Sequence, residues 1–234
     1  MTESAPRTAR ERARLEITAE ILRVGREHLA RDGAAALSLR AVARDLGMVS
    51  SAVYRYVPHR DALLTMLIID AYNALGAEAE RSEAAVARPH LTDRFLAICH
   101  ATRMWALKNP HEYALVYGSP VPGYASPSDT IEPAARVPNL LLAILADAAH
   151  AHKDPAHKQS ALHGALTPLR TFADPTIPDD LLLRGLNAWA GMFGTVSFEL
   201  FGQTRNVVAE GVRLRRAYFD HQMRALAGTL DLTN

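Results

Sequence analysis

Apolar residues in the 234-residue chain recur mainly three and four positions apart, which is the period of an α-helix. Residues 10–31 show this spacing and stop at Gly33, a residue that can adopt the left-handed conformation in which helices often end. A second helix is predicted from Leu39 up to Gly47. We expect the hydroxyl of Ser38 to cap it by accepting hydrogen bonds from its first backbone amides.

The helical pattern continues along the rest of the chain, where signs of β-strands are sparse. A short third helix is predicted over 50–56, and Pro58 separates it from a long fourth helix over 59–80. Loops are expected at 119–129, which holds three prolines and a glycine, and at 151–158. Further helices are predicted over residues 89–108, 110–118, 131–152, 159–171, 178–202 and 206–228. The fold class that we predict is therefore all-α.

Composition and charge narrow the possible functions. The chain is 49% hydrophobic and 22% charged, with a formal net charge of +1. Residues 1–61 hold 11 arginines and no lysine against 8 acidic residues, whereas the remainder has slightly more acidic than basic residues. The N-terminal quarter is therefore the part that we expect to meet an anion. The single cysteine, Cys99, rules out an intrachain disulfide and a multi-thiolate metal site.

Targeting signals are not expected in this sequence. The first sixteen residues are charged and lack the apolar run of a secretory signal. The best candidate for a membrane span, residues 185–201, is interrupted by Asn187, Ser197 and Glu199. With a lone cysteine, these observations predict a cytoplasmic protein with no membrane partner.

The segment LGMVSSAVYRYVPHRDALL, residues 46–64, is unusually rich in hydroxyl and guanidinium groups. With the helix before it, this segment predicts a helix-turn-helix whose turn contains Gly47. The expected shared core consists of Leu39, Val42, Ala43, Leu46, Val53 and Val57. Ser50, Ser51, Tyr54 and Arg55 then face outward, where hydroxyls and arginines suit phosphate oxygens and guanine acceptors in a major groove.

Residues 38–64, SLRAVARDLGMVSSAVYRYVPHRDALL, resemble the DNA-binding signature of the tetracycline-repressor (TetR) family of transcriptional regulators. The resemblance implies that Ser38 opens the first helix of the motif near a phosphate. It also implies that Tyr54 takes the phosphate-contacting tyrosine position and that Arg60 takes the basic position at the start of the fourth helix. The positions that it places near the bases are Arg40, Ser50, Ser51, Ala52 and Arg55.

The chain departs from the family pattern at two neighbouring positions. Tyr56 stands where the family usually has histidine, and Val57 stands where it usually has phenylalanine. We keep Tyr56 among the predicted DNA contacts because its hydroxyl can donate to a phosphate. The alternative is that Tyr54 and Tyr56 are residues at the edge of the core and that Arg55 is an ordinary solvated charge.

Two C-terminal helices carry patterns that suit a homodimer. Small residues at Gly185, Ala188, Gly191 and Gly194 allow another helix to approach closely, and helix 206–228 supplies a partner for a four-helix bundle. The apolar stripe beside them consists of Leu182, Leu186, Trp189, Phe193, Val196 and Leu200. The alternative is that both helices only close the core of the monomer.

Two C-terminal segments resemble the WHG-type ligand domain of some TetR-like regulators. They are WAGMFGTVSFELFG (189–202) and ALKNPHEYALVYGSPVPGY (106–124). Trp189 and Gly194 match the Trp-His-Gly trio, but Phe193 stands at the position of the histidine. The predicted ligand-binding residues are His100, Met104, Trp105, Tyr113, Tyr117, Trp189 and Phe193. The alternative for these side chains is ordinary core packing.

Other classes of function fit the sequence less well. It has no G-x-S-x-G elbow, no H-E-x-x-H motif and no Gly-rich phosphate loop, so we predict that it is not an enzyme and needs no cofactor. A metal site at His150, His152, Asp154 and His157 is less favoured than a solvated turn. A purely architectural DNA-binding protein would not need some 170 residues beyond the reading head, although a ligand-independent regulator stays an alternative.

The sequence therefore predicts a helix-turn-helix DNA-binding domain over 1–62 and a helical ligand-binding and dimerisation domain over 63–234. The predicted function is that of a homodimeric repressor on a pseudo-palindromic double-stranded operator. We expect a small apolar or aromatic ligand to release it from the DNA.

Overall fold

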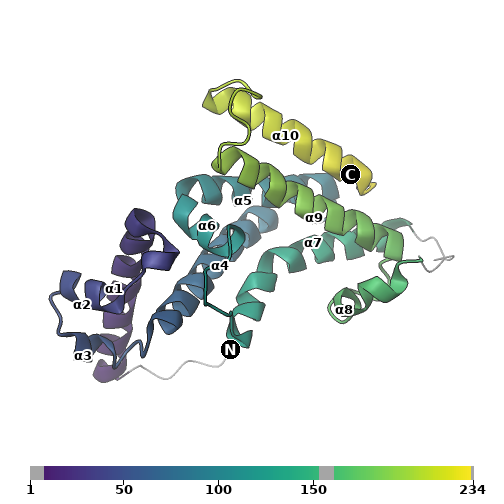
Figure 1. Cartoon of the computed structure of the whole chain (residues 1–234). Helices are drawn as coiled ribbons and strands as arrows, with labels where there is room; N and C mark the ends of the chain where they lie inside the picture. The colour runs from purple at the N-terminus through teal and green to yellow at the C-terminus, as the bar shows by residue number, and fades with distance from the viewer. Residues whose placement is uncertain (1–7, 153–160, 233–234) are drawn as a thin grey trace. The chain divides into compact units, whose positions relative to one another are not determined.

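The computed structural model describes residues 8–152 and 161–232. Within these ranges the chain forms ten α-helices, three short 3₁₀ turns and no β-strand, which confirms the predicted all-α fold (Figure 1). The first six helices are α1 (Ala9–Asp32), α2 (Leu39–Asp45), α3 (Ser50–Val53), α4 (Arg60–Ala84), α5 (Leu91–Lys108) and α6 (Pro110–Tyr117). The last four are α7 (Ile131–His152), α8 (Thr167–Arg170), α9 (Asp179–Leu200) and α10 (Val212–Thr229).

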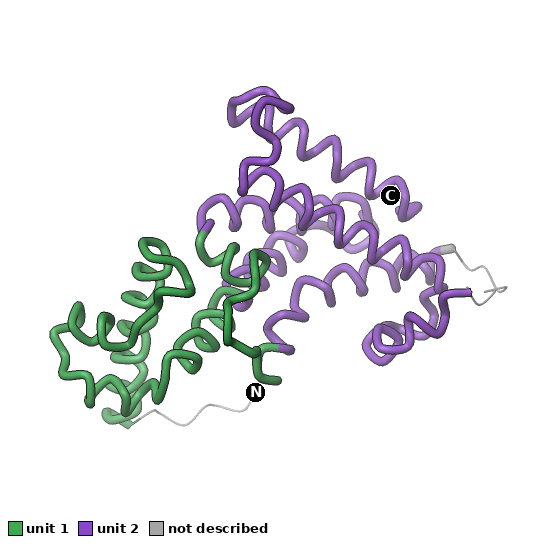
Figure 2. The backbone as a smooth tube through the Cα atoms, viewed as in Figure 1, with its two compact units in different colours: residues 1–71, 111–130 green, residues 72–110, 131–234 purple. Residues whose placement is uncertain are grey.

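The chain divides into two compact units, which Figure 2 shows in different colours. Unit 1 comprises Met1–Ala71 and His111–Thr130, and unit 2 comprises Tyr72–Pro110 and Ile131–Asn234. The predicted boundary after residue 62 divides the chain by function, whereas these units divide it by packing. Helix α4 runs through residue 62 without a break, and its second half belongs to unit 2.

Unit 1 is built around the core of the helix-turn-helix. The predicted core residues Leu39, Val42, Ala43, Val53 and Val57 are all buried there, and Leu46 is partly buried against them. Helices α1 and α4 complete this core with Ile21, Val24, Leu63, Leu64 and Leu67. Helix α6 and the segment after it also pack on this core, α6 through Leu115 and the following segment through Val121 and Tyr124.

Helix α4 is long and apolar enough to cross a membrane by length and composition alone, unlike the predicted candidate 185–201. Its apolar side chains are instead used inside the protein. Leu63, Leu64 and Leu67 are buried in unit 1, and Leu75 and Ala79 are buried in unit 2. This is the pattern of a core helix.

Helix α5 is the central helix of unit 2. It packs against α7, α9 and α10, and α9 also packs against α7 and α10 (Figure 1). Five residues of α5 that are spaced alternately by four and three positions are all buried, namely Leu91, Phe95, Ile98, Thr102 and Trp105. The helical period therefore identified the buried face of this helix correctly.

Three predicted helices are shorter in the structure than their sequence pattern indicated. Helix α3 ends at Val53 rather than near residue 56, and residues 54–56 form a turn. The described part of 159–171 forms a 3₁₀ turn, His163–Leu166, followed by the single turn of α8, where Pro168 has no amide hydrogen to donate. The last helix begins at Val212 rather than residue 206 because Gly211, with φ of 129°, interrupts the helical backbone before it.

Candidate nucleic-acid interface

The turn between α2 and α3 is a Schellman motif centred on Gly47. The amide of Met48 donates to the carbonyl of Ala43 at 2.9 Å, and the amide of Gly47 donates to the carbonyl of Arg44 at 3.0 Å. Gly47 has φ of 64°, a conformation that side chains with a Cβ rarely adopt. The predicted turn is therefore confirmed, and its geometry fixes how α3 leaves α2.

A buried histidine braces this motif against α1. His28 is only 2% exposed, and its Nε2 lies 2.7 Å from a carboxylate oxygen of Asp45 at the end of α2. The hydrogen bond from His28 lowers the pKa of the Asp45 carboxyl below its ordinary value. The contact ties α1 to α2 through two residues that are 17 positions apart in the sequence.

Helix α3 and the two residues after it present exposed polar side chains to solvent. Ser51 and Arg55 are exposed, and Tyr54 is 40% exposed, as the sequence predicted. Arg40 on α2 is exposed as well. Within the described residues, neither Arg40 nor Arg55 has an ion pair or a side-chain hydrogen bond, so both guanidinium groups are available. Ser50 and Ala52 are half-buried beside them.

Ser38 occupies the N-cap position of α2 as predicted, but its side chain makes no capping hydrogen bond. The expectation that its hydroxyl accepts from the first amides of α2 was therefore wrong. At the half-buried N-cap position, the Ser38 backbone is extended (φ −136°, ψ 119°), and the carbonyl of Ser38 accepts from the amide of Val42 at 3.0 Å.

Tyr56 and Arg60, two further predicted DNA contacts, have intramolecular roles in the structure. Tyr56 is half-buried and packs against the core of unit 1. The guanidinium of Arg60 donates to the backbone carbonyls of Ala34 and Ala35 at 2.9 and 3.3 Å, and it also pairs with Asp61. These contacts hold the short turn that follows α1, so any phosphate contact of either residue would be additional to a structural role.

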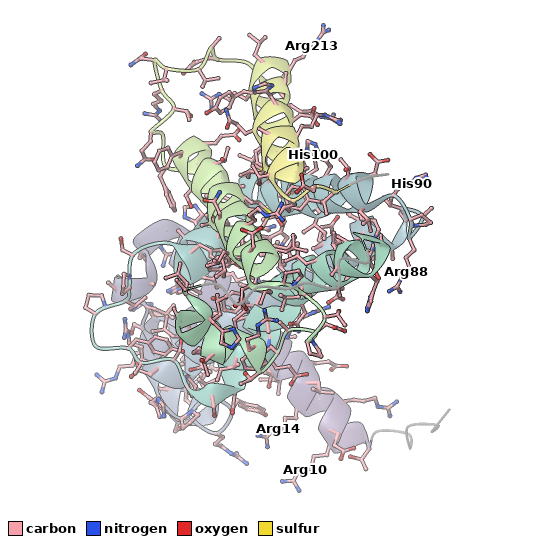
Figure 3. The ribbon with its side chains drawn as sticks, turned by 90° about the vertical axis from the view of Figure 1, so that its right-hand side faces the viewer. Arg10, Arg14, Arg88, His90, His100 and Arg213 are labelled. Carbon is pink, nitrogen blue, oxygen red and sulfur yellow. The ribbon has the colours of Figure 1, made fainter. Side chains whose placement is uncertain are left out.

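The first two turns of α1 form an exposed extension that the sequence reading did not single out. Residues 8–16 are all exposed, and Ile17 is the first residue of α1 that packs against the core of unit 1. The extension is capped by Thr8 and Glu11, which exchange side-chain-to-backbone hydrogen bonds. Its arginines are Arg10, Arg12 and Arg14; Figure 3 shows Arg10 and Arg14 projecting from the free end of α1. The excess of arginine in the N-terminal quarter of the sequence was the feature that could have indicated these three exposed arginines.

The predicted ligand-binding residues are divided between the two units. Tyr113, which is buried, and Tyr117, which is half-buried, are in unit 1, with ring centroids 5.1 Å apart. In unit 2, the rings of Trp189 and Phe193 meet edge to face at 5.8 Å. The last three lie on α5, where Met104 is exposed, Trp105 is buried and His100 is half-buried.

His100 links α5 to α10. Its Nε2 lies 3.0 Å from Asp220, and its ring packs edge to face on Phe219 with centroids 5.5 Å apart (Figure 3). Hydrogen bonds from Arg224 and His100 lower the pKa of the Asp220 carboxyl below its ordinary value. The Nε2 atom of His100, a predicted ligand-binding residue, therefore already has a hydrogen-bond partner within unit 2.

Among the described residues, no group of three potential metal ligands is found. His150 is exposed, with its Nε2 3.4 Å from the hydroxyl of Thr176. The side chain of His152 and the whole of Asp154 and His157 lie outside the described residues.

The α9 stripe predicted for dimerisation is used partly inside the protomer. Leu182, Phe193 and Val196 are buried. A Cβ added at Gly185 would overlap the side chain of Leu145 on α7, and one added at Gly191 would lie 3.0 Å from Leu226 on α10. These glycines therefore allow close packing within unit 2.

A second face of α9 stays exposed. Leu186, Ala190, Gly194 and Phe198 follow one another at intervals of four, so they share one face of the helix. Leu186 and Phe198 are 40% and 58% exposed, and a Cβ added at Gly194 would meet nothing. On α10, Leu214 and Tyr218 are also exposed, and together these residues are an unusual concentration of exposed apolar side chains.

Comparisons with known proteins agree with this architecture. Residues 95–226 match the family described as "Tetracyclin repressor-like, C-terminal domain". The HTH-type transcriptional regulator Rv1816 of Mycobacterium tuberculosis is 41% identical over 223 residues, which cover 93% of this chain and 94% of that protein. This relative is named as a regulator, and the likeness extends through both units.

Solved structures show the same fold. The crystal structure of the regulatory protein SCO4313 superposes with a TM-score of 0.78 at 34% identity, covering 94% of this chain and all of that one. PfmR, a TetR family regulator from Thermus thermophilus, has a TM-score of 0.56 at 18% identity, covering 87% of this chain and 97% of its own. With the helix-turn-helix geometry and the family match, these likenesses lead to one conclusion. The chain belongs to the tetracycline-repressor (TetR) family of helix-turn-helix transcriptional regulators, and it is not an enzyme.

Proposed function

We propose that this regulator acts as a homodimeric repressor that reads a pseudo-palindromic operator and leaves it when a small molecule binds. The observation that carries the DNA-reading part is the exposed surface of α3 and the two residues after it, with Ser51, Tyr54 and Arg55, which follows the Schellman turn at Gly47. A short helix presented in this way suits the major groove, where arginine can bridge guanine O6 and N7.

The roles proposed for the α3 surface differ from residue to residue. Arg40 and Arg55, whose guanidinium groups are unpaired within the described residues, are proposed to read bases. Tyr54 is proposed to contact a phosphate through its hydroxyl, which positions the protein without reading sequence. Six further residues are also proposed to contact DNA, as the sequence predicted, namely Ser38, Ser50, Ser51, Ala52, Tyr56 and Arg60.

Replacing Arg55 by alanine is expected to relax the preference for one operator base, with a loss of about 1–3 kcal/mol on the preferred sequence only. Tyr54→Phe is expected to weaken operator and random duplexes alike without changing the salt dependence, because no charge is removed. Fluorescence anisotropy with both duplexes at several salt concentrations measures both effects. Parallel losses of the two variants on both duplexes would contradict this division of roles.

The extension of α1 is proposed to contact the DNA backbone beside the reading head. In the view of Figure 1 the start of α1 and α3 both lie at the lower end of unit 1. Arg10 and Arg14 are four residues apart and exposed, so they present their charges on one side of α1. Arginines without an intramolecular partner suit phosphates, whose contacts release counterions and make binding dependent on salt.

The double variant Arg10→Ala/Arg14→Ala removes two arginines from each protomer, so for the dimer it is expected to reduce the slope of log K against log salt concentration by about 4. Its sequence preference is expected to be unchanged, since phosphate contacts carry no sequence information directly. Arg213→Ala is the matched control: it removes an exposed arginine at the start of α10 (Figure 3). An equal slope for the double variant and the control would refute the proposed contact.

Dimerisation is proposed to use the exposed faces of α9 and α10. Leu186, Ala190, Gly194 and Phe198 form a continuous row with small residues at its centre, which allows a second α9 to approach. A two-fold pair of reading heads separated by one helical turn of DNA, roughly 34–36 Å, then matches a pseudo-palindrome. The contrast between the exposed Phe198 and the buried Phe193 supports assigning the first to the interface and the second to the core.

Release by a small molecule is proposed to act through linkage between two sites. A ligand that favours a dimer with the wrong spacing of reading heads weakens operator binding. Operator DNA must then weaken ligand binding by the same factor, typically about 5–150-fold. Trp189 and Gly194 support the proposed likeness to the WHG-type subgroup, whereas Phe193 stands at the position of its histidine. A ligand-independent regulator is the alternative.

A further inference from the structure

Unit 2 contains a cavity of about 160 Å³ between α7, α8 and α9. Its walls are mostly leucines, among them Leu141 on α7, Leu169 on α8 and Leu182 on α9. Pro138, Gly185 and Trp189 complete it. Within the described part of the chain no charged side chain lines this cavity, and the indole N–H of Trp189 is its one side-chain hydrogen-bond donor.

The glycine in the wall shapes the cavity. Because Gly185 has no Cβ, the side chain of Leu145 comes directly against the backbone of α9. Leu145 and Leu182 are buried, whereas Leu186 and Trp189 are 40% and 38% exposed. The floor of the cavity is therefore closed by packed leucines, and two side chains on the outer side of α9 form its rim.

The lining sets the chemistry of an occupant. A ligand that brings a charge among these side chains loses its hydration and gains no partner in return. An apolar cavity of about 150 Å³ is large enough for benzene. The volume here, about 160 Å³, is of the same size. We propose that this cavity is the effector site and that its ligand is an uncharged, hydrocarbon-like molecule with one six-membered ring.

This inference rests on the proposed ligand-controlled function, to which it adds the location of the site and the class of ligand. The site differs from the set predicted from the sequence, because Trp189 alone of those seven residues lines the cavity. Its rim residue Leu186 also belongs to the exposed row of α9 that is proposed to form the dimer. A ligand that moves Leu186 or Trp189 therefore acts directly on the surface that sets the spacing of the reading heads.

The site is tested with benzene, using Trp189 as the reporter. The chain has two tryptophans, so Trp105→Phe, a substitution outside the cavity, leaves Trp189 as the single indole. Titration of the full chain with benzene is expected to change the Trp189 emission in a saturable way. Benzoate and benzylammonium have the same ring with a charge, and they are expected to bind at least about tenfold more weakly.

Two matched variants separate the cavity from the rest of the surface. Leu142→Phe adds ring atoms to the wall and is expected to weaken benzene binding at least tenfold, whereas Leu107→Phe makes the same change on α5, outside the cavity. Circular dichroism establishes that each variant is folded. If Leu142→Phe does not fold, the comparison of benzene with benzoate and benzylammonium still tests whether the cavity binds an uncharged ring.

Operator binding distinguishes this inference from the proposed function. Saturable benzene binding that leaves operator affinity unchanged supports the site and refutes release by this ligand class. An absence of benzene binding while operator binding is intact overturns the inference and leaves DNA recognition standing. A Trp189 that becomes shielded as protein concentration rises, with no response to benzene, also overturns it, because a second copy then covers the rim.

Discussion

Phe198→Asp is expected to convert the dimer into a monomer and to weaken operator binding at least about 100-fold. Phe198 is 58% exposed on the outer face of α9 and is not among the buried core residues. In a dimer that packs two α9 helices together, two carboxylates would be brought into an apolar interface, where burial of a charge is costly. Two linked reading heads gain about 10²–10⁴ in avidity over one, and the monomer forfeits that gain.

Phe172→Asp is the matched control for this prediction. Phe172 is 72% exposed, but it lies after α8 and outside the faces of α9 and α10. The mass of both variants by light scattering and their operator affinity by anisotropy are the two measurements needed. A Phe198→Asp protein that keeps the wild-type mass and affinity would place the dimer interface elsewhere.

Arg103→Met is expected to lower the free energy of unfolding by about 3–5 kcal/mol, because it leaves a buried carboxylate without its partner. The guanidinium of Arg103 on α5 donates two hydrogen bonds to Glu199 on α9, at 2.7 and 2.6 Å. Their side chains are only 4% and 9% exposed. The ring of Phe219 on α10 lies 5.4 Å from the same guanidinium, so one ion pair joins three helices.

Urea denaturation of the single and double variants distinguishes loss of the pair from loss of packing. The double variant Arg103→Met/Glu199→Leu removes both charges, and it is expected to recover most of the stability that the single variant loses. An exposed pair elsewhere on the surface, Arg23 with Glu20, provides the control: Arg23→Met is expected to leave the urea midpoint nearly unchanged, because water screens an exposed ion pair. A double variant as unstable as Arg103→Met would show that the ion pair itself is not the source of the loss.

The parts of the fold that depend on local sequence were predictable. The helical period gave the buried face of α5 and both ends of α7, and Gly47 marked a turn whose positive φ requires glycine. The start of α10 was not predictable in this way. Residues 206–211 have helix-compatible spacing, but Asn206 and Gly211 adopt positive φ values that end one segment and begin another.

The other features that the sequence did not predict depend on contacts between residues that are distant in the sequence. Arg103 and Glu199 are 96 residues apart, and no local pattern indicates that they meet. Arg60 similarly binds carbonyls 26 and 25 residues away, so a position read only as a phosphate contact also holds the chain after α1. The α9 stripe could not be divided into a buried and an exposed side, because that division depends on where α7 and α10 pack.

The exposed surface of α3 is proposed to read the sequence of double-stranded DNA. Selection of bound duplexes from a random pool, followed by sequencing, tests this proposal most directly. We expect an enriched inverted repeat whose half-site centres are one helical turn, about 10–10.5 base pairs, or a multiple of it apart. We also expect that Arg55→Ala loses the preference at one position of each half-site. A pool that emerges without an enriched sequence, or the same enriched sequence for Arg55→Ala at every position, would contradict the proposal.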